Sequence, residues 1–385
     1  MIEAKPFQIA IPQMAIARIN RRVRDFEWHE MPRGQGLDGS WAYGANLDYM
    51  KRLADYWITG YDWRKEEEAL NRFPQFIANV DGLGIHFYRE DGSGPAPRPL
   101  ILSHGWPGSV FEFLHIIEKL AHPERFGGDV KDAFTVIVPS LPGYGFSGKP
   151  LRPISPRTTA RLFDKLMTDV CGLPNYIAQG GDWGSMVSGW LGYEGKGCRA
   201  VHLNMFGWRS PGVHPQTDEE KQYATRALQL FEMEGAYFRE QATKPQTLSY
   251  AMMDSPVGAA AWIIEKFHGW SDKERGFETI YSMDQLLTNV MIYLVSKSFN
   301  TATWMYRGFM EDVSGDPVPS GARIEKPVGV AAFPIDIIPM PPRKLAERHM
   351  NIVHWTDFPG GGHFAALERP DDLVGDVRAF ARVLG

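Results

Sequence analysis

The stretch Gly180-Gly181-Asp182-Trp183-Gly184-Ser185 decides the fold prediction. The run 175–179 before it is typical of a short buried strand, and residues 186–193 after it can form a helix. Small residues crowd both sides of Asp182, as a sharp strand-to-helix turn requires, because larger neighbours would clash there. The sequence therefore predicts an aspartate at the tip of such a turn, where a nucleophile is presented to substrate.

A carboxylate nucleophile restricts the chemistry that Asp182 can perform. It cannot sustain an acyl-transfer cycle as a serine does, but it can attack an sp³ carbon and form an alkyl ester that water then cleaves. The residue type at this turn therefore points to epoxides or alkyl halides as substrates, rather than to esters.

The composition is that of a soluble globular protein. The chain has 385 residues, of which 44% are hydrophobic and 23% charged, and its length suggests a large α/β unit with attached parts. A net charge of −5 gives no indication of a nucleic-acid partner. Cys171 and Cys198 form no CxxC pair, so we expect neither a disulfide framework nor a cysteine zinc site.

The sequence also indicates where the protein is located and which ligands it needs. The N-terminus lacks the apolar core of a signal peptide, and the longest apolar run, 257–264, is far shorter than the ~20 residues of a membrane span. We therefore expect a cytoplasmic protein without a membrane span. We expect no metal ion and no cofactor, and a homo-oligomer is compatible with the sequence.

Apolar strands that alternate with helices predict an α/β fold with a mostly parallel, covered sheet. Core strands are predicted at 100–102, 134–138, 175–179, 328–333 and 352–355, a hairpin at 75–80 and 85–89, and helices at 46–57, 110–120, 161–171, 218–237, 256–267, 282–298 and 374–384. The parts expected are an N-terminal extension (1–95), the first part of the core (96–209), a helical cap (210–310) and the second part of the core (311–385). The cap should cover the sheet edge where α/β proteins bind ligands.

Asp182, an acid near residue 336 and His363 occur in the chain order of the α/β-hydrolases. The loop Gly360-Gly361-Gly362-His363-Phe364 follows a predicted strand, and its glycines would let the imidazole turn towards the nucleophile. Asp336 is the preferred acid, since it follows the strand 328–333. Glu325 lies too early, and Glu347 is typical of an exposed helix position. The acid would hold the histidine tautomer and stabilise the imidazolium.

Two further elements of the site are predicted. The run His104-Gly105-Trp106-Pro107 follows the first core strand, where the backbone N–H of Trp106 can form an oxyanion hole with that of Trp183. Epoxide opening leaves an alkoxide, and a tyrosine hydroxyl on an apolar wall is a suitable proton donor. The chain alone leaves the donor open among Tyr223, Tyr237, Tyr250, Tyr281, Tyr293 and Tyr306.

Several segments together carry a family resemblance. They are Pro6-Phe7, 63–65 and 71–76 near the N-terminus, 104–109 (HGWPGS), 180–185 (GGDWGS), 243–245, 254–258 and 286–289 in the expected cap, and 361–366 around the histidine. With these motifs, nearly the whole chain resembles the microsomal-type epoxide hydrolases, which include the juvenile-hormone epoxide hydrolases. The resemblance implies an α/β-hydrolase fold with an N-terminal meander that wraps the core and the cap in a structural role.

The resemblance also implies an activity and site residues. The expected reaction converts an epoxide and water into a vicinal diol, a detoxifying reaction, through an ester on Asp182. The two tyrosines of the family correspond to Tyr237, shortly before Thr243-Lys244-Pro245, and to Tyr306. The charge-relay acid follows a Phe-Pro pair and corresponds to Asp336, where mammalian members commonly carry glutamate. We expect this protein to lack the N-terminal membrane anchor of mammalian members.

Two alternatives remain open at the level of sequence. A haloalkane dehalogenase also uses an aspartate followed by tryptophan at this turn, although it needs halide-binding N–H donors instead of a tyrosine pair. A non-catalytic ligand-binding protein could share the fold. Trp106, Trp183 and Trp208 suggest an apolar substrate of aromatic or terpenoid type, but the sequence does not identify the physiological epoxide or its stereochemistry.

Overall fold

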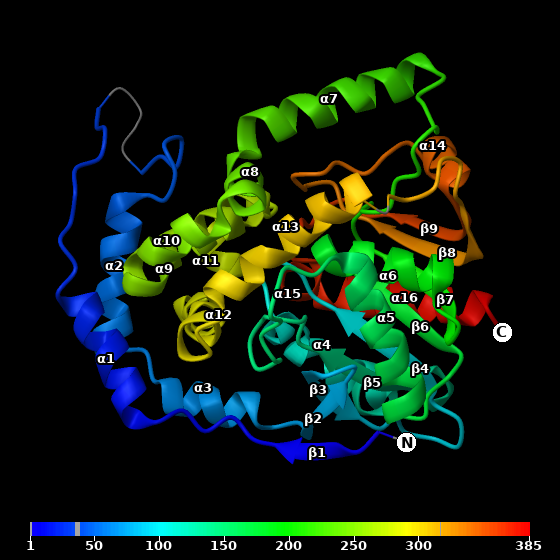
Figure 1. Ribbon diagram of the computed structural model, residues 1–385, viewed down its shortest axis with the longest axis horizontal. Coiled ribbons are helices and arrows are strands. Elements are labelled where there is room, and N and C mark those ends of the chain that lie inside the picture. Colours follow the sequence, from blue (N-terminus) through cyan, green and yellow to red (C-terminus); the bar gives the residue numbers. More distant parts are fainter. Residues whose placement is uncertain (1, 35–38, 316) are drawn as a thin grey trace.

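The computed structural model describes residues 2–34, 39–315 and 317–385 (Figure 1). Within these residues, nine strands form one sheet in the order β1-β2-β3-β5-β4-β6-β7-β8-β9. Their bounds are β1 (Ala4–Phe7), β2 (Gln75–Val80), β3 (Leu83–Glu90), β4 (Arg98–Ser103), β5 (Phe134–Pro139), β6 (Tyr176–Gly180), β7 (Cys198–Leu203), β8 (Ile324–Ala332) and β9 (Met350–Asp357).

The sheet is mostly parallel, as the sequence predicts. β1, β2 and β3 pair antiparallel with one another, and β3 pairs antiparallel with β5. From β5 onward every neighbouring pair is parallel. The carboxyl ends of these strands therefore meet at one edge of the sheet, which brings together the loops that follow β4, β6, β8 and β9.

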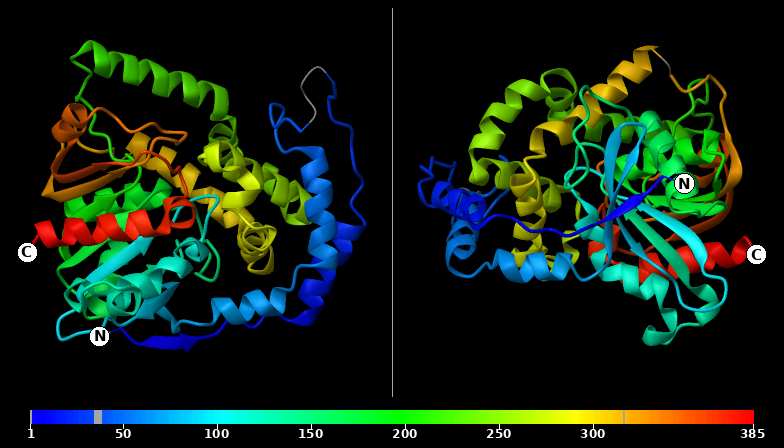
Figure 2. Two further views of the ribbon diagram at one scale, coloured as in Figure 1. Left: turned by 180° about the vertical axis from the view of Figure 1, so that it is seen from behind. Right: turned by 60° about the horizontal axis from the view of Figure 1, so that its bottom comes forward.

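Helices cover both faces of the sheet. α5 (Pro156–Lys165) and α6 (Asp182–Glu194) pack on one face, while α4 (Leu114–Ala121) and α16 (Pro370–Val383) pack on the other (Figures 1 and 2). The central parallel strands are largely apolar because helices cover both of their faces; all six residues of β5, for example, are buried.

The segment between β7 and β8 is helical in the part that the structure describes. This helical insertion contains α7 (Asp218–Glu234), α8 (Ala236–Thr243), α9 (Pro245–Asp254), α10 (Pro256–Trp270), α11 (Phe277–Ile280), α12 (Met283–Val295) and α13 (Phe299–Gly315). The remaining helices are α1 (Gln13–Arg24), α2 (Leu47–Thr59) and α3 (Trp63–Leu70) before the core, and α14 (Arg343–His349) and α15 (Ala365–Glu368) within it. In Figure 1 the helices α8 to α12 lie between the sheet and the pair α1 and α2, while α7 runs across the top of the view.

The N-terminal helices hold the insertion from outside. α1 and α2 both contact α10 and α12. Arg52 of α2 pairs with Glu278 at 2.7 Å, and the hydroxyl of Tyr56 donates to Asp284 at 2.8 Å. Trp41 stacks on His268 with ring centroids 4.0 Å apart. These contacts tie the first part of the chain to helices more than two hundred residues later.

Some elements differ from the sequence prediction. The expected helix 218–237 is two helices, since α7 ends at Glu234 and α8 begins after Gly235. The expected helix 282–298 ends at Val295, and Lys297 adopts a left-handed φ of 54° before α13 begins. β7 was not predicted, because Arg199 and His202 interrupt its apolar run. His202 is nevertheless buried, with Asp376 of α16 as its hydrogen-bond partner at 2.8 Å.

The packing of α6 against β4 depends on the absence of a side chain at Gly184. A Cβ at this position would lie 1.8 Å from the carbonyl oxygen of Ser103, which is backbone and cannot turn away. A Cβ on Gly180 would lie 2.2 Å from the carbonyl oxygen of Gly184. The motif is glycine-rich because the helix starts in direct contact with two strands.

We expect Gly184→Ala to destabilise the fold by about 3 kcal/mol or more, since inserted methyl groups in a packed core cost about 1–3 kcal/mol and the backbone here must move. The thermal unfolding midpoint measures this effect. The control is Gly375→Ala in α16, where no atom lies within 4 Å of the added methyl group. A helical alanine there should be neutral or stabilising. Equal midpoints for the two variants would contradict the packing account.

Candidate active site

Asp182 is the first residue of α6 and follows β6 after a single glycine, Gly181. Its φ is +47°, in the left-handed region that aspartate tolerates better than bulkier residues do. A Cβ on Gly181 would lie 2.5 Å from Nδ2 of Asn204, so this neighbour must also be small. The turn pushes the carboxylate out of the sheet edge, and 16% of the side chain stays exposed towards a cavity.

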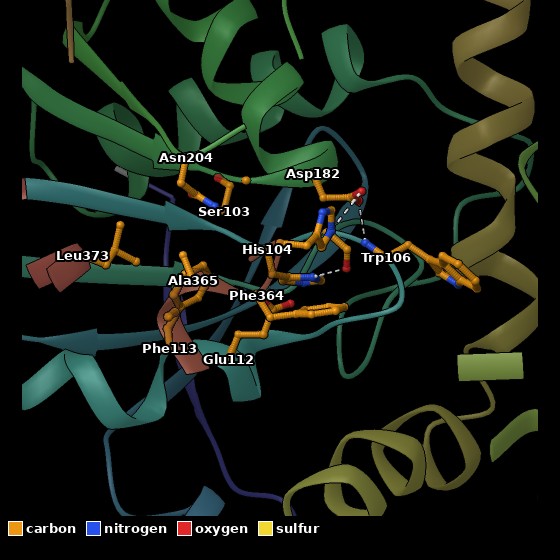
Figure 3. A pocket seen from close by; sticks show the side chains of 14 residues that line it. Ser103, His104, Trp106, Glu112, Phe113, Asp182, Asn204, Phe364, Ala365 and Leu373 are labelled. Atoms are coloured by element: carbon orange, nitrogen blue, oxygen red, sulfur yellow. Dashed lines mark hydrogen bonds and ion pairs between the residues drawn. The ribbon is translucent and has the colours of Figure 1, made fainter. Parts of the chain in front are cut away.

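The backbone N–H of Trp106 donates to Oδ1 of Asp182 at 2.7 Å (Figure 3). The backbone N–H of Trp183 also favours the carboxylate form of this residue. The structure thus brings together the two N–H groups that the sequence predicts as an oxyanion hole, with the Asp182 carboxylate between them.

The loop that carries Trp106 is held by α12. Asn289 donates through Nδ2 to the carbonyl oxygen of Pro107 at 2.8 Å and accepts from the hydroxyl of Ser109 at 2.8 Å. The hydroxyl of Tyr293, on the same helix, donates to the carbonyl oxygen of Gly108 at 2.6 Å. The helical insertion therefore fixes the strand end that presents the Trp106 N–H.

His104 has a structural role in the same loop. Its Nε2 accepts a hydrogen bond from the backbone N–H of Leu141 at 3.1 Å, so Nδ1 carries the proton and donates to the carbonyl oxygen of Gly105 at 3.0 Å. Burial lowers the pKa of His104 to about 4 and so favours the neutral form that these two contacts require.

His363 lies between two carboxylates. Its Nδ1 is 2.9 Å from Oδ1 of Asp336, and its Nε2 is 3.5 Å from Oδ2 of Asp182. An ionised carboxylate only accepts, so Nδ1 donates its proton to Asp336 and Nε2 faces Asp182. Asp336 lies in the loop after β8, and its Oδ1 also accepts from the backbone N–H of Ile338 at 3.2 Å. The two alternative acids pair with arginines elsewhere: Glu325 with Arg323 and Glu347 with Arg343.

The charges around His363 control its proton affinity. Burial disfavours the imidazolium, but the negative charges of Asp336, Asp182 and Glu112 outweigh it and raise the pKa of His363 to about 9. Burial also raises the pKa of Asp182, against the opposing effects of His363 and of the two backbone N–H groups. The charged imidazolium thus offsets part of the cost of burying Asp182.

The histidine loop is fastened to the insertion by residues that sequence reasoning missed. The N–H of His363 donates to the carbonyl oxygen of Trp270, at the end of α10, at 3.0 Å. The Asp272 carboxylate accepts from the N–H of Gly361 at 2.8 Å. Glu368 accepts from the N–H groups of Asp272 and Phe364, both at 2.9 Å. A lone Asp or Glu in sequence gives no signal for such contacts.

The candidate tyrosines differ in exposure and in the partners of their hydroxyl groups. Tyr250 is 76% exposed, Tyr281 is hydrogen-bonded to Ser271, and Tyr293 is bonded to Gly108. Tyr237 and Tyr306 lie together, with ring centroids 6.0 Å apart.

Tyr237 and Tyr306 both contact the tryptophans of the predicted oxyanion hole. Tyr237 stacks on Trp106 at 5.3 Å, and Tyr306 meets Trp183 edge-on at 4.7 Å. The hydroxyl of Tyr306 is buried without a hydrogen-bond partner among the described residues. Burial is the main cause that raises the pKa of each phenol well above its ordinary value, and nearby negative charges add to it. Both hydroxyls therefore keep their protons. Tyr223 lines the same cavity, but its hydroxyl accepts from Arg209 at 3.2 Å.

A cavity of about 510 Å³ opens at Asp182 between the core and the insertion. Its walls are mostly apolar and include Trp183, Phe231, Phe238 and Ile338. Such a volume fits a drug-sized organic molecule. Trp208, which the sequence also associated with the substrate, packs against Trp190 in the core and does not line this cavity.

Neither a metal site nor a membrane span is found in the residues that the structure describes. Within them, no group of three or more His, Cys, Asp or Glu residues is arranged to hold a metal ion. No helix in these ranges is long and apolar enough to cross a membrane.

Comparisons with known proteins identify the family. The family model "Epoxide hydrolase N terminus" matches residues 4–113, and the model "alpha/beta hydrolase fold" matches residues 98–257. Epoxide hydrolase 1 of Oryctolagus cuniculus is 35% identical over 372 residues, which cover 88% of this chain and 80% of that protein.

Solved structures agree with the sequence comparisons. The Aspergillus niger epoxide hydrolase has a TM-score of 0.85 at 33% identity, covering 98% of this chain and 96% of that one. The juvenile hormone epoxide hydrolase of the silkworm Bombyx mori has a TM-score of 0.87 at 27% identity, covering 100% and 96%. The predicted α/β-hydrolase fold is confirmed, and the chain belongs to the epoxide hydrolase family.

Proposed function

We propose that this epoxide hydrolase works through a covalent ester on Asp182, which water activated by His363 and Asp336 then hydrolyses. One observation carries the proposal: a single carboxylate has one oxygen bound by a backbone N–H at 2.7 Å and the other 3.5 Å from Nε2 of His363. The same carboxylate borders the large apolar cavity. This arrangement suits a nucleophile whose ester is later attacked by water.

The first step is ring opening. Oδ2 of Asp182 attacks an epoxide carbon, the C–O bond of the ring breaks, and the oxygen takes a proton from Tyr237 or Tyr306. Both hydroxyls stay protonated because burial disfavours phenolate, so they are available as donors. The aromatic walls exclude water, which strengthens the hydrogen bonds to the developing alkoxide.

The second step is hydrolysis of the ester. Water gives a proton to Nε2 of His363 and adds to Cγ of Asp182, while the N–H groups of Trp106 and Trp183 stabilise the oxyanion that forms. The intermediate collapses, the bond to the alkyl oxygen breaks, and the proton passes from the imidazolium to the departing diol. The second hydrogen of the water then leaves the regenerated carboxyl group of Asp182 for His363, which restores the carboxylate and the imidazolium of the free enzyme. Asp336 stabilises the imidazolium and holds its tautomer.

Ester formation itself prepares the base. In the free enzyme the raised pKa of His363 leaves the imidazole protonated at neutral pH. An ester at Asp182 carries no charge, so one of the groups that raise this pKa is lost. The pKa of His363 should then fall, so the imidazolium gives up its proton, which restores the tyrosinate left by ring opening to a phenol. The neutral imidazole needed for hydrolysis thus becomes available after alkylation.

We also propose that residues 210–310 act as a cap that closes the cavity, and that residues 1–95 support this cap. The substrate class that fits best is an apolar epoxide of drug-like size, since the walls of the cavity of about 510 Å³ are mostly apolar.

His363→Gln should still form the ester but hydrolyse it about 10²–10⁴-fold more slowly, as expected when a general base is removed. Intact-protein mass spectrometry after addition of styrene oxide should show the mass of the substrate added to the enzyme. The control is the double variant with Asp182→Asn, which should gain no mass. A folded His363→Gln variant that never accumulates ester would contradict the assigned role.

Replacing both Tyr237 and Tyr306 by Phe should slow ring opening at least about 10²-fold, because the alkoxide loses both donors in a dry site. Each single variant should retain alkylation through the remaining hydroxyl. Stopped-flow tryptophan fluorescence reports ester formation, since Trp106 and Trp183 contact the site. Tyr223→Phe is the matched control, because this residue lines the cavity but is bound to Arg209. Near-normal alkylation in the double variant would exclude the pair.

Asp182→Asn should lower the pKa of His363 from about 9, because it removes a neighbouring negative charge without removing volume. A proton NMR titration of ¹³C-labelled histidine would follow this group, and Glu347→Gln on the partly exposed α14 serves as control. With a pKa raised to about 9, His363 is protonated at neutral pH in the wild type. Because the variant lacks the negative charge that favours protonation, its His363 should titrate at lower pH. An unchanged midpoint would show that Asp182 does not act on the base.

A further inference from the structure

A second, much smaller cavity of about 20 Å³ also borders Asp182 (Figure 3). Asp182 is the residue that this cavity shares with the substrate cavity. The other polar side chains around it are Ser103, His104, Glu112, Asn204 and His363. The volume exceeds the 10–15 Å³ or so that one water molecule requires, and a buried water needs about two to four polar partners. The small cavity meets both conditions for a single water.

Glu112 reaches this cavity through an unusual approach to the backbone. Glu112 belongs to the short 3₁₀ helix Val110–Phe113. Its Oε1 packs directly against the backbone of Gly108, because a Cβ atom added to Gly108 would lie only 1.5 Å from Oε1. Gly108 is therefore required for the carboxyl group of Glu112 to occupy this place. The mechanism described above makes no use of this buried acid.

The charges of the site act directly on Glu112. Burial raises its pKa to about 8, the positive charge of His363 and the N–H of Ser109 act to lower it, and the negative charge of Asp182 acts to raise it. In turn, Glu112 is one of the groups that raise the pKa of His363. Glu112 also lines the small cavity together with both reacting groups, Asp182 and His363.

The ester stage needs a water in this region. Once an ester has formed, the alkyl group of the substrate fills the large cavity in front of Asp182. The attacking water must contact both Nε2 of His363 and Cγ of Asp182. The small cavity is lined by both of these residues and is separate from the space that the alkyl group occupies.

We infer that the small cavity holds the hydrolytic water and that Glu112 is a water-positioning residue, which binds this water through its carboxyl group and directs it at Cγ of Asp182. The inference rests on the proposed covalent mechanism. In the step itself, one hydrogen of the water passes to Nε2 of His363 and its oxygen bonds to Cγ. The carboxyl group of Glu112 accepts a hydrogen bond from the other hydrogen, and its own proton count does not change.

Single-turnover kinetics of Glu112→Leu tests the inference with styrene oxide as probe. We expect the hydrolysis rate of the ester to fall about 10- to 100-fold, as for the loss of one strong hydrogen bond to the reacting water. The alkylation rate should stay within about threefold, because ring opening consumes no water. Glu112→Gln keeps a carbonyl acceptor and should recover most of the hydrolysis rate. Glu118→Leu on α4 is the matched control, since Glu118 is 35% exposed and pairs with Arg125.

Two outcomes would overturn the inference: normal ester hydrolysis in Glu112→Leu, or an equal slowing of alkylation and hydrolysis, which indicates a structural role. Failure of the covalent mechanism looks different, since wild-type enzyme would then form no ester at all. If Glu112→Leu does not fold, a high-resolution crystal structure of the wild type decides. It should show a water within about 3 Å of both Glu112 and Nε2 of His363, and an empty cavity overturns the inference.

Discussion

The buried negative charge of Asp182 is the constraint on which the rest of the site depends. A carboxylate in apolar surroundings is costly unless donors and an opposite charge compensate for the lost water. Here the N–H of Trp106 at 2.7 Å and the imidazole of His363 at 3.5 Å supply that compensation. The left-handed turn holds the carboxylate between them. In the proposed mechanism an ester at Asp182 would remove the charge, and the pKa of His363 would fall at the stage when hydrolysis needs the neutral imidazole.

The groups that compensate this charge come from loops that the sheet alone does not hold. α12 binds the loop of Trp106 through Asn289, and the end of α10 binds the loop of His363 through the carbonyl oxygen of Trp270. Both helices belong to the insertion, which α1 and α2 contact from outside. The N-terminal segment therefore packs against the helices α10 and α12, which in turn hold the loops of the site. We expect its contribution to be geometric, since a misplacement of about 1 Å in such a site is enough to slow the reaction.

The sequence predicted those features that local patterns encode. The glycines around Asp182 predict a sharp turn, and the glycines before His363 predict a loop that can turn the imidazole towards Asp182. Apolar runs predicted most strands of the core. The two tyrosines were different: with fourteen in the chain, only the family resemblance selected Tyr237 and Tyr306. Glu112 was not singled out because its proposed role depends on the fold, which places this glutamate in one small cavity with Asp182 and His363. β7 was missed for a similar reason, since the buried His202 within it is hydrogen-bonded to Asp376 of the distant helix α16.

The most direct test of the covalent mechanism follows oxygen atoms through one turnover. Enzyme in excess over styrene oxide, in water enriched in ¹⁸O, should carry the label in the carboxylate of Asp182, because water attacks Cγ and the diol receives an enzyme oxygen. Proteolysis and mass spectrometry of the peptide that contains Asp182 would detect a gain of about 2 Da, the mass difference between the isotopes, in line with a carboxylate nucleophile. An unlabelled peptide together with ¹⁸O in the first diol released would contradict the account, since water would then have attacked the epoxide directly.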